Sequence, residues 1–478
     1  MKKTYVTTMP DHVGAFLEAS RQFATLGLNI TRVSYNKAVD THTLFIEAEG
    51  SQEQHRKADE ALGSIGYLQS DTQDQSIVLL EFQLRDAPGS ITGVLELIRE
   101  FNFNISYMSS QENGTDHQAF KMGLFVDNQQ KVNDFLARAE QLCVVRVMDY
   151  NHTQQNFDNS IFYRSYAAGL TRRMGLNDDA KQELLIYVNL AMQVLDEQGL
   201  SPYRTFDSIS RFAEMLMLYR GNAFSPRIST HAVTARTQIT LIEPPCGSNT
   251  AILQSGDETL FIDSGYACYR EEMVRIFRRL LPEFDSMPKR AFLTHADLDH
   301  CGLLPIFDTV DMSAQSADCI RREYEGEDGY RERNPLHRPY IRICKTLTEY
   351  RPMKPENIRV ICGDLEPQES ALQHVGAYSF GELRFEVYQG KGGHLPGELV
   401  LIEYTHKLAF TGDVYVNLKE MTAEQAAYNQ YAPILMTSVD TDAALCAQER
   451  AEVFQRLGVG DWRIFGAHGM KKDYRVHV

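Results

Sequence analysis

The stretch that most constrains this chain is Leu293-Thr294-His295-Ala296-Asp297-Leu298-Asp299-His300-Cys301-Gly302, which places two histidines and two acids within six residues. The apolar run at 291–293 predicts a buried strand before it, and the run at 303–307 predicts an apolar turn or helix start after it. Such loops, held by a rigid scaffold, are where α/β folds place functional groups. Imidazole and carboxylate are ligands that suit Zn, Fe or Mn. The pattern therefore indicates a metal site, and the alternative is a solvated acidic turn with incidental histidines.

Further ligand-type residues follow other expected strands downstream of residue 238. The strands expected at 239–242, 249–253 and 258–262 lead to Asp263, and a helix is expected at 271–281. The later blocks are Gly392-Gly393-His394-Leu395, Phe410-Thr411-Gly412-Asp413 and Phe465-Gly466-Ala467-His468. Each block alone is a weak signal, but the four in this order are a strong indication of a metal centre.

These blocks resemble the metallo-β-lactamase fold, the αββα sandwich of a superfamily of metallohydrolases, over about residues 232–478. The resemblance implies that one metal ion is held by His295, Asp297 and His394, and a second by Asp299, His300 and His468. It also implies that Asp413 bridges the two ions and that Asp263 orients ligands.

One residue departs from the family pattern, because Asp297 stands where the family usually has its second histidine. Three consequences stay open. The site prefers a harder ion such as Mn²⁺ or Fe²⁺, it holds two ions with one more negative charge, or its first half is weak and the protein is mononuclear.

The resemblance implies a hydrolase with two divalent ions, zinc being the first expectation and manganese or iron the alternatives. A metal-activated water would attack an ester, thioester, lactone, amide or phosphodiester. Asp299 would be catalytic, orienting the water or taking its proton. The alternatives are a di-iron redox protein and a non-catalytic metal-containing sensor on the same fold. A structural site fills every metal position with protein, whereas a hydrolase leaves one open.

The first 150 residues contain a duplication with an offset of 75 positions. Seven residue types recur, among them Asp11 on Asp86, Gly14 on Gly89 and Ser34 on Ser109. A constant offset is typical of repeated structural units. Each copy predicts the order β-α-β-β-α-β, with a Gly at the first strand-to-helix turn.

This order, with Asp86-Ala87-Pro88-Gly89-Ser90 before the helix, resembles the ACT domain, a ferredoxin-like regulatory module. The resemblance implies that the module binds a small molecule, often an amino acid, and that it pairs. A turn glycine lets the backbone approach a ligand, so Gly14, Gly89, Asp11 and Asp86 are the candidate effector-binding residues. The alternative is that both glycines only make tight turns.

The fold class expected overall is α+β multidomain, with two βαββαβ domains, a helical connector and a C-terminal αββα sandwich. The expected domains are residues 1–72, 73–152, 153–228 and 229–478. Within the last domain, an insertion at 321–342 carries six arginines and five acids. It is either a solvated helix face or a cap that binds an anionic substrate.

Composition limits the classes of partner. The net charge of −16 over 478 residues argues against nucleic acid, so a small-molecule substrate is expected. The sequence has no apolar run of about 18 residues and no signal-type start, which predicts a cytoplasmic protein without a membrane span. Eight scattered cysteines form no Cys-x-x-Cys pair, so neither a disulfide framework nor a thiolate zinc site is expected. Paired ACT domains and apolar connector helices predict a homodimer.

Overall fold

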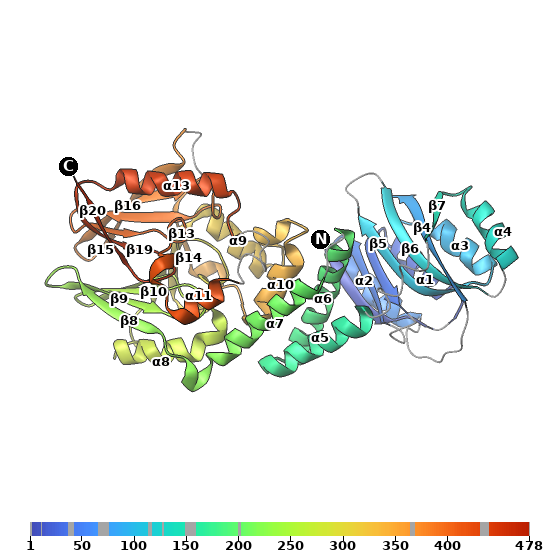
Figure 1. Cartoon of the computed structure of the whole chain (residues 1–478), viewed down its shortest axis with the longest axis horizontal. Helices are drawn as coiled ribbons and strands as arrows, with labels where there is room; N and C mark the ends of the chain where they lie inside the picture. The colour runs from blue at the N-terminus through green and yellow to red at the C-terminus, as the bar shows by residue number, and fades with distance from the viewer. Residues whose placement is uncertain are drawn as a thin grey trace. The chain divides into compact units, whose positions relative to one another are not determined.

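The structure is a computed structural model that describes residues 2–10, 12–36, 43–65, 76–112, 117–126, 129–148, 159–198, 202–363, 369–430 and 439–477. The chain forms two compact units, made of Met1–Gly169 with Val188–Leu200 and of Leu170–Tyr187 with Ser201–Val478. The expected helical connector is thus divided between them. Figure 1 follows the chain from blue to red. In the described ranges, no helix is long and apolar enough to cross a membrane.

The N-terminal unit is built on one seven-stranded sheet in the order β1-β3-β2-β5-β6-β4-β7. Its elements are β1 (Lys2–Thr8), α1 (Ala15–Thr25), β2 (Asn29–Asn36), β3 (Thr43–Glu49), α2 (Gln52–Ser64), β4 (Ser76–Arg85), α3 (Thr92–Glu100), β5 (Asn104–Glu112), β6 (His117–Val126), α4 (Gln129–Ala139) and β7 (Val144–Met148). The second copy therefore has the order β-α-β-β-α-β. The last strand expected for the first copy falls on 66–75, outside the described residues.

The two copies join edge to edge through β2 and β5. The strands are antiparallel, and Ser34 lies opposite Ser109, which is its counterpart 75 positions later. Equivalent positions therefore meet at the joint, as a local two-fold relation requires. One hydrophobic core, from Tyr5 to Ala139, runs under both copies.

Three helices follow, α5 (Asn159–Met174), α6 (Asp178–Glu197) and α7 (Pro202–Leu218). They lie within residues 153–228, where the sequence predicts a helical connector. Phe212 of α7 is buried against the rings of Tyr266 and Tyr428 in the C-terminal unit, to which it also belongs.

The C-terminal unit holds two sheets, with strand orders β14-β13-β12-β11-β10-β9-β8 and β15-β16-β17-β18-β19-β20. The strands of the first are β8 (Arg227–Ala232), β9 (Thr237–Glu243), β10 (Thr250–Ser255), β11 (Glu258–Ile262), β12 (Arg290–Phe292), β13 (Thr309–Ser313) and β14 (Ile358–Cys362). Those of the second are β15 (Leu372–Phe380), β16 (Leu383–Gly390), β17 (Leu399–Glu403), β18 (Leu408–Phe410), β19 (Gly460–Phe465) and β20 (Lys472–Val476).

The two sheets face each other across a shared core. Leu241 and Leu253 of the first sheet belong to the same buried cluster as Phe385 and Leu401 of the second. The unit also contains the helices α8 (Arg270–Leu280), α9 (Ala314–Tyr324), α10 (Arg338–Leu347), α11 (Ala423–Asn429) and α13 (Ala443–Arg456).

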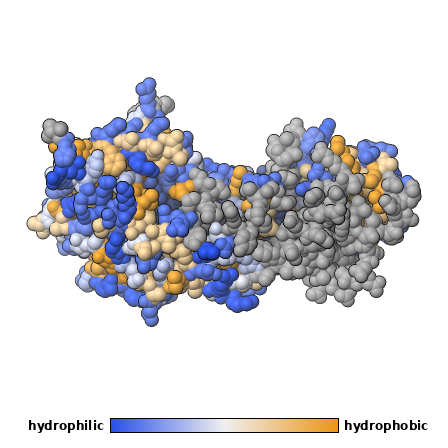
Figure 2. Space-filling view, in the orientation of Figure 1, coloured by the Kyte–Doolittle hydropathy of each residue, from blue (hydrophilic) through white to orange (hydrophobic). Residues whose placement is uncertain are grey.

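Helices cover the outer faces of both sheets. Phe277 of α8 packs on Phe261 of the first sheet, and Val453 of α13 lies in a second cluster with Val400 and Trp462 of the other. The layers are therefore helix, sheet, sheet and helix (Figure 1). On the visible face of this unit, hydrophilic and hydrophobic residues are interspersed (Figure 2).

Candidate metal centre

The polar blocks of the C-terminal unit meet where strands of both sheets end. β11 and β12 are parallel neighbours in one sheet, and β18 and β19 are parallel neighbours in the other. The backbone N–H of Leu399, which opens β17, donates to the carbonyl of Thr294 after β12 at 2.9 Å. The loops after β11, β12, β18 and β19 and the loop before β17 therefore converge at one edge of the sandwich.

Six of the expected ligands form two groups of donor atoms, each group within 4.8 Å. The groups are His295, His394 and Asp413, and Asp299, His300 and His468.

Asp413 lies between the two groups. Its Oδ2 is 3.5 Å from Nε2 of His394, and its Oδ1 is 3.6 Å from Nε2 of His300 and 3.5 Å from Nε2 of His468. One oxygen therefore faces each group, as a bridging carboxylate requires.

Four of the candidate donor atoms are buried and have no hydrogen-bond partner. His295, His300 and His394 are at most 1% exposed, and the Nε2 atom of each is buried with no hydrogen-bond partner, as is Oδ1 of Asp413. Buried polar atoms are normally paired. Convergent unpaired imidazole nitrogens and a carboxylate oxygen fit a cation that bonds to all of them, so the donor set fits a divalent metal.

Acids lie behind the rings of the three buried histidines. Nδ1 of His300 is 3.0 Å from Asp263, Nδ1 of His394 is 3.0 Å from Asp440, and Nδ1 of His295 is 3.5 Å from Glu398. Such contacts on the far nitrogen fix the ring so that Nε2 points at the metal.

Asp263 acts from a sharp turn. It follows β11 with a φ of 56°, which is uncommon for a residue other than glycine, and it also accepts from the backbone N–H and the hydroxyl of Thr294. It thus ties the metal loop to the end of β11.

The pKa values of His300 and His468, the two histidines of the second group, reflect a surplus of negative charge. Burial opposes the charged form of His468, but Asp413 and Asp299 raise its pKa to about 10. Burial likewise opposes protonation of His300, yet Asp299, Asp263 and Asp413 raise its pKa well above the ordinary value. The carboxylates therefore favour positive charge between them, which a divalent ion would supply.

Asp297, expected as a ligand of the first ion, lies outside both groups. Its two carboxylate oxygens accept from Nε and an Nη of Arg331 at 2.7–3.1 Å. Both side chains are less than 8% exposed. Burial opposes ionisation of Asp297, but the Arg331 guanidinium holds its pKa below the usual value. The carboxylate of Asp297 is thus bound by the guanidinium of Arg331, a contact that the sequence did not predict.

Arg331 comes from the insertion at 321–342, which the structure folds into the end of α9, a turn and the start of α10. The interpretation as a solvated helix face is wrong for its middle part, because Arg331 is 8% and Glu332 is 1% exposed. Glu332 pairs with Arg342 of α10 and with Lys345. The ends of the insertion do carry exposed pairs such as Arg322 with Glu327.

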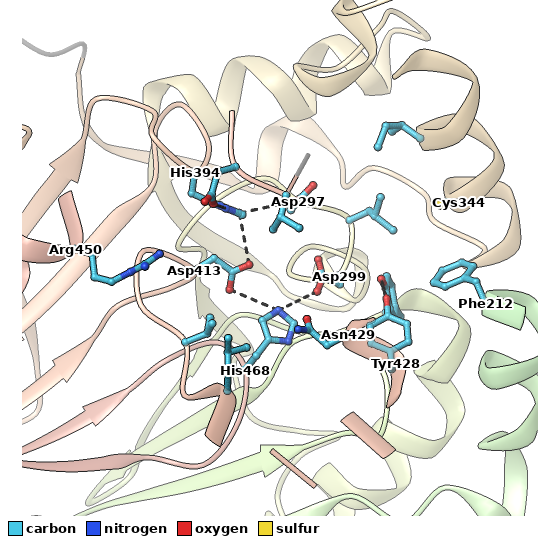
Figure 3. A pocket seen from close by; sticks show the side chains of 17 residues that line it. Phe212, Asp297, Asp299, Cys344, His394, Asp413, Tyr428, Asn429, Arg450 and His468 are labelled. Carbon is cyan, nitrogen blue, oxygen red and sulfur yellow. Dashed lines mark hydrogen bonds and ion pairs between the residues drawn. The ribbon is translucent and has the colours of Figure 1, made fainter. Parts of the chain in front are cut away.

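A cavity of about 230 Å³ opens onto the centre. It is lined by five of the expected site residues and by apolar and aromatic side chains from distant segments: Asp297, Asp299, His394, Asp413 and His468 with Phe212, Tyr266, Ile341, Val416 and Tyr428. Figure 3 shows Asp299, Asp413 and His468 pointing toward one another, with Tyr428 and Phe212 on one side and Arg450 on the other.

The tyrosines and Arg450 carry the polar groups of the wall. The hydroxyls of Tyr266 and Tyr428 are hydrogen-bonded to each other, and both rings are buried. Arg450 of α13 donates from Nε to the carbonyl of Val414 and makes no ion pair within the described part of the chain.

The candidate effector residues lie in the N-terminal unit. Gly14 and Gly89 adopt φ of 87° and 80° at the starts of α1 and α3, a conformation that favours glycine. The carboxylate of Asp86 accepts from Asn29 of the other copy at 2.9 Å. Asp11 lies outside the described residues. Effector binding at these positions stays a prediction.

Comparison with known proteins gives one family match, in which residues 244–310 match the model of the metallo-beta-lactamase superfamily. The matched segment lies within the C-terminal unit. This superfamily is largely hydrolytic and binds divalent metals such as zinc or iron. No curated protein matches the chain.

Several solved structures are similar in part. A metallo-beta-lactamase from Pontibacter korlensis is 13% identical at a TM-score of 0.30, over 52% of this chain and 94% of that one. A flavoprotein from Thermotoga maritima is 13% identical at 0.33, over 52% of this chain and 58% of its own length. An aspartate kinase from Synechocystis is 13% identical at 0.25, over 31% and 28%.

Several residues of the site were not predicted from sequence. Glu398, Asp440 and Arg331 contact a candidate donor or the expected ligand Asp297, and Phe212 and Tyr428 form the wall. Glu398 had a usable signal, because it is a single acid between Gly397 and the apolar run that opens β17. The others carry no local pattern.

Proposed function

We propose that this protein is a metal-dependent hydrolase of the metallo-beta-lactamase superfamily that acts on an ester, thioester, lactone, amide or phosphodiester bond of a small molecule. The observation that carries the proposal is the pair of donor groups, in which three buried, unpaired Nε2 atoms and Asp413 converge beside an open cavity. An open cavity beside the donors favours catalysis over a purely structural metal site.

Two divalent ions are proposed, with zinc first and manganese or iron as alternatives. Bound there, such ions would make a nucleophilic water available near neutral pH and stabilise an oxyanion. His295, His394 and Asp413, and Asp299, His300 and His468, would hold them. The carboxylate of Asp299 lines the cavity, with Oδ2 3.4 Å from Nε2 of His468, which supports the proposal that Asp299 accepts a proton from the attacking water.

The cavity also suggests the shape of the substrate. Phe212 and the ring of Tyr428 offer an apolar surface for the part of the molecule on one side of the scissile bond (Figure 3). On the other side Arg450 offers a guanidinium without an ion-pair partner among the described residues, and guanidinium groups bind carboxylate or phosphate. The proposed substrate therefore has an apolar part and an anionic group.

The test is hydrolysis of a chromogenic panel by metal-loaded protein: p-nitrophenyl acetate, the monoanionic p-nitrophenyl succinate, a thioester, a lactone and bis-p-nitrophenyl phosphate. We expect turnover of at least one substrate that a chelator abolishes and added metal restores. Asp413→Asn should lower kcat/KM at least a hundredfold, because one oxygen of Asp413 faces each donor group. Asp257→Asn, which changes an exposed turn carboxylate, is the matched control and should behave as wild type.

Other results would contradict the proposal. If the purified protein contains no metal, or if a chelator leaves the turnover intact, the proposal of a metal-dependent hydrolase is contradicted. Oxygen consumption by an iron-loaded protein without hydrolysis would favour the redox alternative instead.

For the N-terminal unit we propose an amino-acid effector near Gly14, Gly89, Asp11 and Asp86, and a homodimer. Both follow from the ACT resemblance. Equilibrium dialysis with the twenty amino acids and light scattering of the full chain test them separately.

A further inference from the structure

The two donor groups differ in the number of side chains that they offer. The second group has Asp299, His300 and His468, with Oδ1 of Asp413 as a fourth donor. The first group has His295 and His394, with Oδ2 of Asp413. The side chain that would complete it is Asp297, whose Oδ2 is 3.9 Å from Nε2 of His394.

Arg331 controls that missing donor. Its two hydrogen-bonding nitrogens bind both oxygens of Asp297 in a forked arrangement, the geometry that suits guanidinium and carboxylate best. A carboxylate bound in this way has fewer lone pairs for a metal. The guanidinium also places a buried positive charge next to the first group, and a like charge disfavours a divalent cation in a low dielectric.

The arginine is fixed in place. One Nη also donates to the carbonyl of Val439 at 2.9 Å. The neighbouring Glu332 accepts from the N–H of Gly329 and from Lys345 at 2.7 and 2.8 Å. A buried guanidinium anchored through its own turn cannot leave Asp297 without breaking these bonds.

We propose that Arg331 is a positioning residue that withdraws Asp297 from the metal centre, so that the second group binds a divalent ion tightly and the first group binds one weakly. The inference rests on the proposed function, since both concern the same centre. In the protein, a low concentration of free metal would fill only the second group, and the first would fill as the concentration rises.

The experiment is a titration of chelator-treated full-length protein with Zn²⁺ and with Mn²⁺, followed by calorimetry and by elemental analysis after dialysis. Wild type should show two classes of site that differ at least tenfold in Kd. Arg331→Met combined with Asp297→Asn removes both charges and should change the weaker Kd less than threefold. Arg331→Met combined with Asp297→His adds a neutral donor and should tighten the weaker class at least tenfold.

The control is Arg333→Met, which removes an exposed guanidinium two residues away that pairs with Asp318, and it should leave both classes unchanged. Loss of the weaker class of metal site in the variant with Arg331→Met and Asp297→Asn would overturn the inference, because Asp297 would then bind both Arg331 and the metal. Two equal classes in wild type would overturn it as well while leaving the hydrolase intact. Absence of any bound ion would remove both proposals. Each variant is first checked for folding by circular dichroism and thermal melting. Because there are two double variants, the inference can still be tested if one of them fails to fold.

Discussion

At the scale of single residues, the candidate centre is held by acids that are not themselves among its donors. Glu398 is 1% exposed, and its Oε1 accepts from the backbone N–H groups of Asp413 and Val414 at 2.6 and 3.1 Å. One carboxylate oxygen thus holds the loop that carries the bridging aspartate while it lies near the ring of His295. Burial raises the pKa of Glu398 to about 8, so at pH 7 its side chain is mostly uncharged.

That environment predicts different outcomes for two substitutions. Glu398→Ala leaves two buried N–H groups unpaired and should lower the free energy of unfolding of the metal-free protein by about 3 kcal/mol. Glu398→Gln keeps a carbonyl acceptor of the same shape and should cost less than about 1 kcal/mol at pH 7. Urea denaturation followed by tryptophan and tyrosine fluorescence measures both. Equal losses would show that the negative charge, and not the acceptor, matters at this position.

The candidate donors could be proposed from the sequence because each lies in a short, recognisable pattern of neighbouring residues. His295, Asp299 and His300 share one loop, and Asp413 and His468 follow strands that are apolar in sequence. The status of Asp297 was not predictable. Its partner Arg331 is 34 positions away, in a segment where six arginines and five acids are interspersed, and only the fold selects one pair among them.

At the scale of elements, ion pairs hold together the parts of the insertion between β13 and β14. Asp328 accepts from Arg338 and Arg342 of α10 at 2.9–3.2 Å. Lys345 of α10 pairs with Glu323 of α9 and with Glu332. The two helices and the turn between them are therefore linked through side chains around the residue that holds Asp297.

The stability that the ion pairs of Asp328 contribute should depend on pH. Burial opposes ionisation of Asp328, but Arg338 and Arg342 lower its pKa below the ordinary value. Because the folded pKa is lower than the unfolded one, the ionised group stabilises the protein above about pH 4, and this stability is lost as the pH falls through the folded value. Asp328→Asn should therefore be less stable than wild type by about 1 kcal/mol at pH 7, since the pair is partly exposed.

The measurement is the difference in urea midpoint between the variant and wild type at pH 7, 5, 4 and 3.5. The difference should be constant down to about pH 4 and shrink below it. Asp318→Asn, which removes an exposed carboxylate paired with Arg333, is the control and should show almost no difference at any pH. A difference that persists unchanged at pH 3.5 would mean that the charge of Asp328 contributes nothing.

At the scale of the whole molecule, the chain has separate cores in its N-terminal and C-terminal units. The duplication predicted two similar copies in the first unit, and the order of elements followed from the turn residues and apolar periods. That the copies share one sheet was not predictable, because the pairing of β2 with β5 joins two edges that carry no local signal in the sequence.

Two cores predict two unfolding transitions in calorimetry. A bound ion stabilises only the unit that holds the centre, by about 2.7 kcal/mol at a free concentration a hundred times the Kd. Zinc should therefore raise one transition and leave the other in place, and Asp413→Asn should abolish the shift. Ser110→Ala should lower only the other transition, because Ser110 accepts from the backbone N–H of Val33 at the joint between the copies. A single transition that moves as a whole with zinc would contradict this division.

The cavity wall reaches back into α7, outside the segment that matches the family. Phe212 contacts Tyr266 and Tyr428, and the hydroxyl of Tyr269 donates to the carbonyl of Leu216. A gene fragment that began at residue 229, where the sequence suggested a domain boundary, would encode every candidate donor and both sheets except the first two residues of β8, yet it would lack one side of the cavity. A segment exchanged between genes would therefore also have to bring a matching α7, because without Phe212 the rings of Tyr266 and Tyr428 would lose their cover on this side.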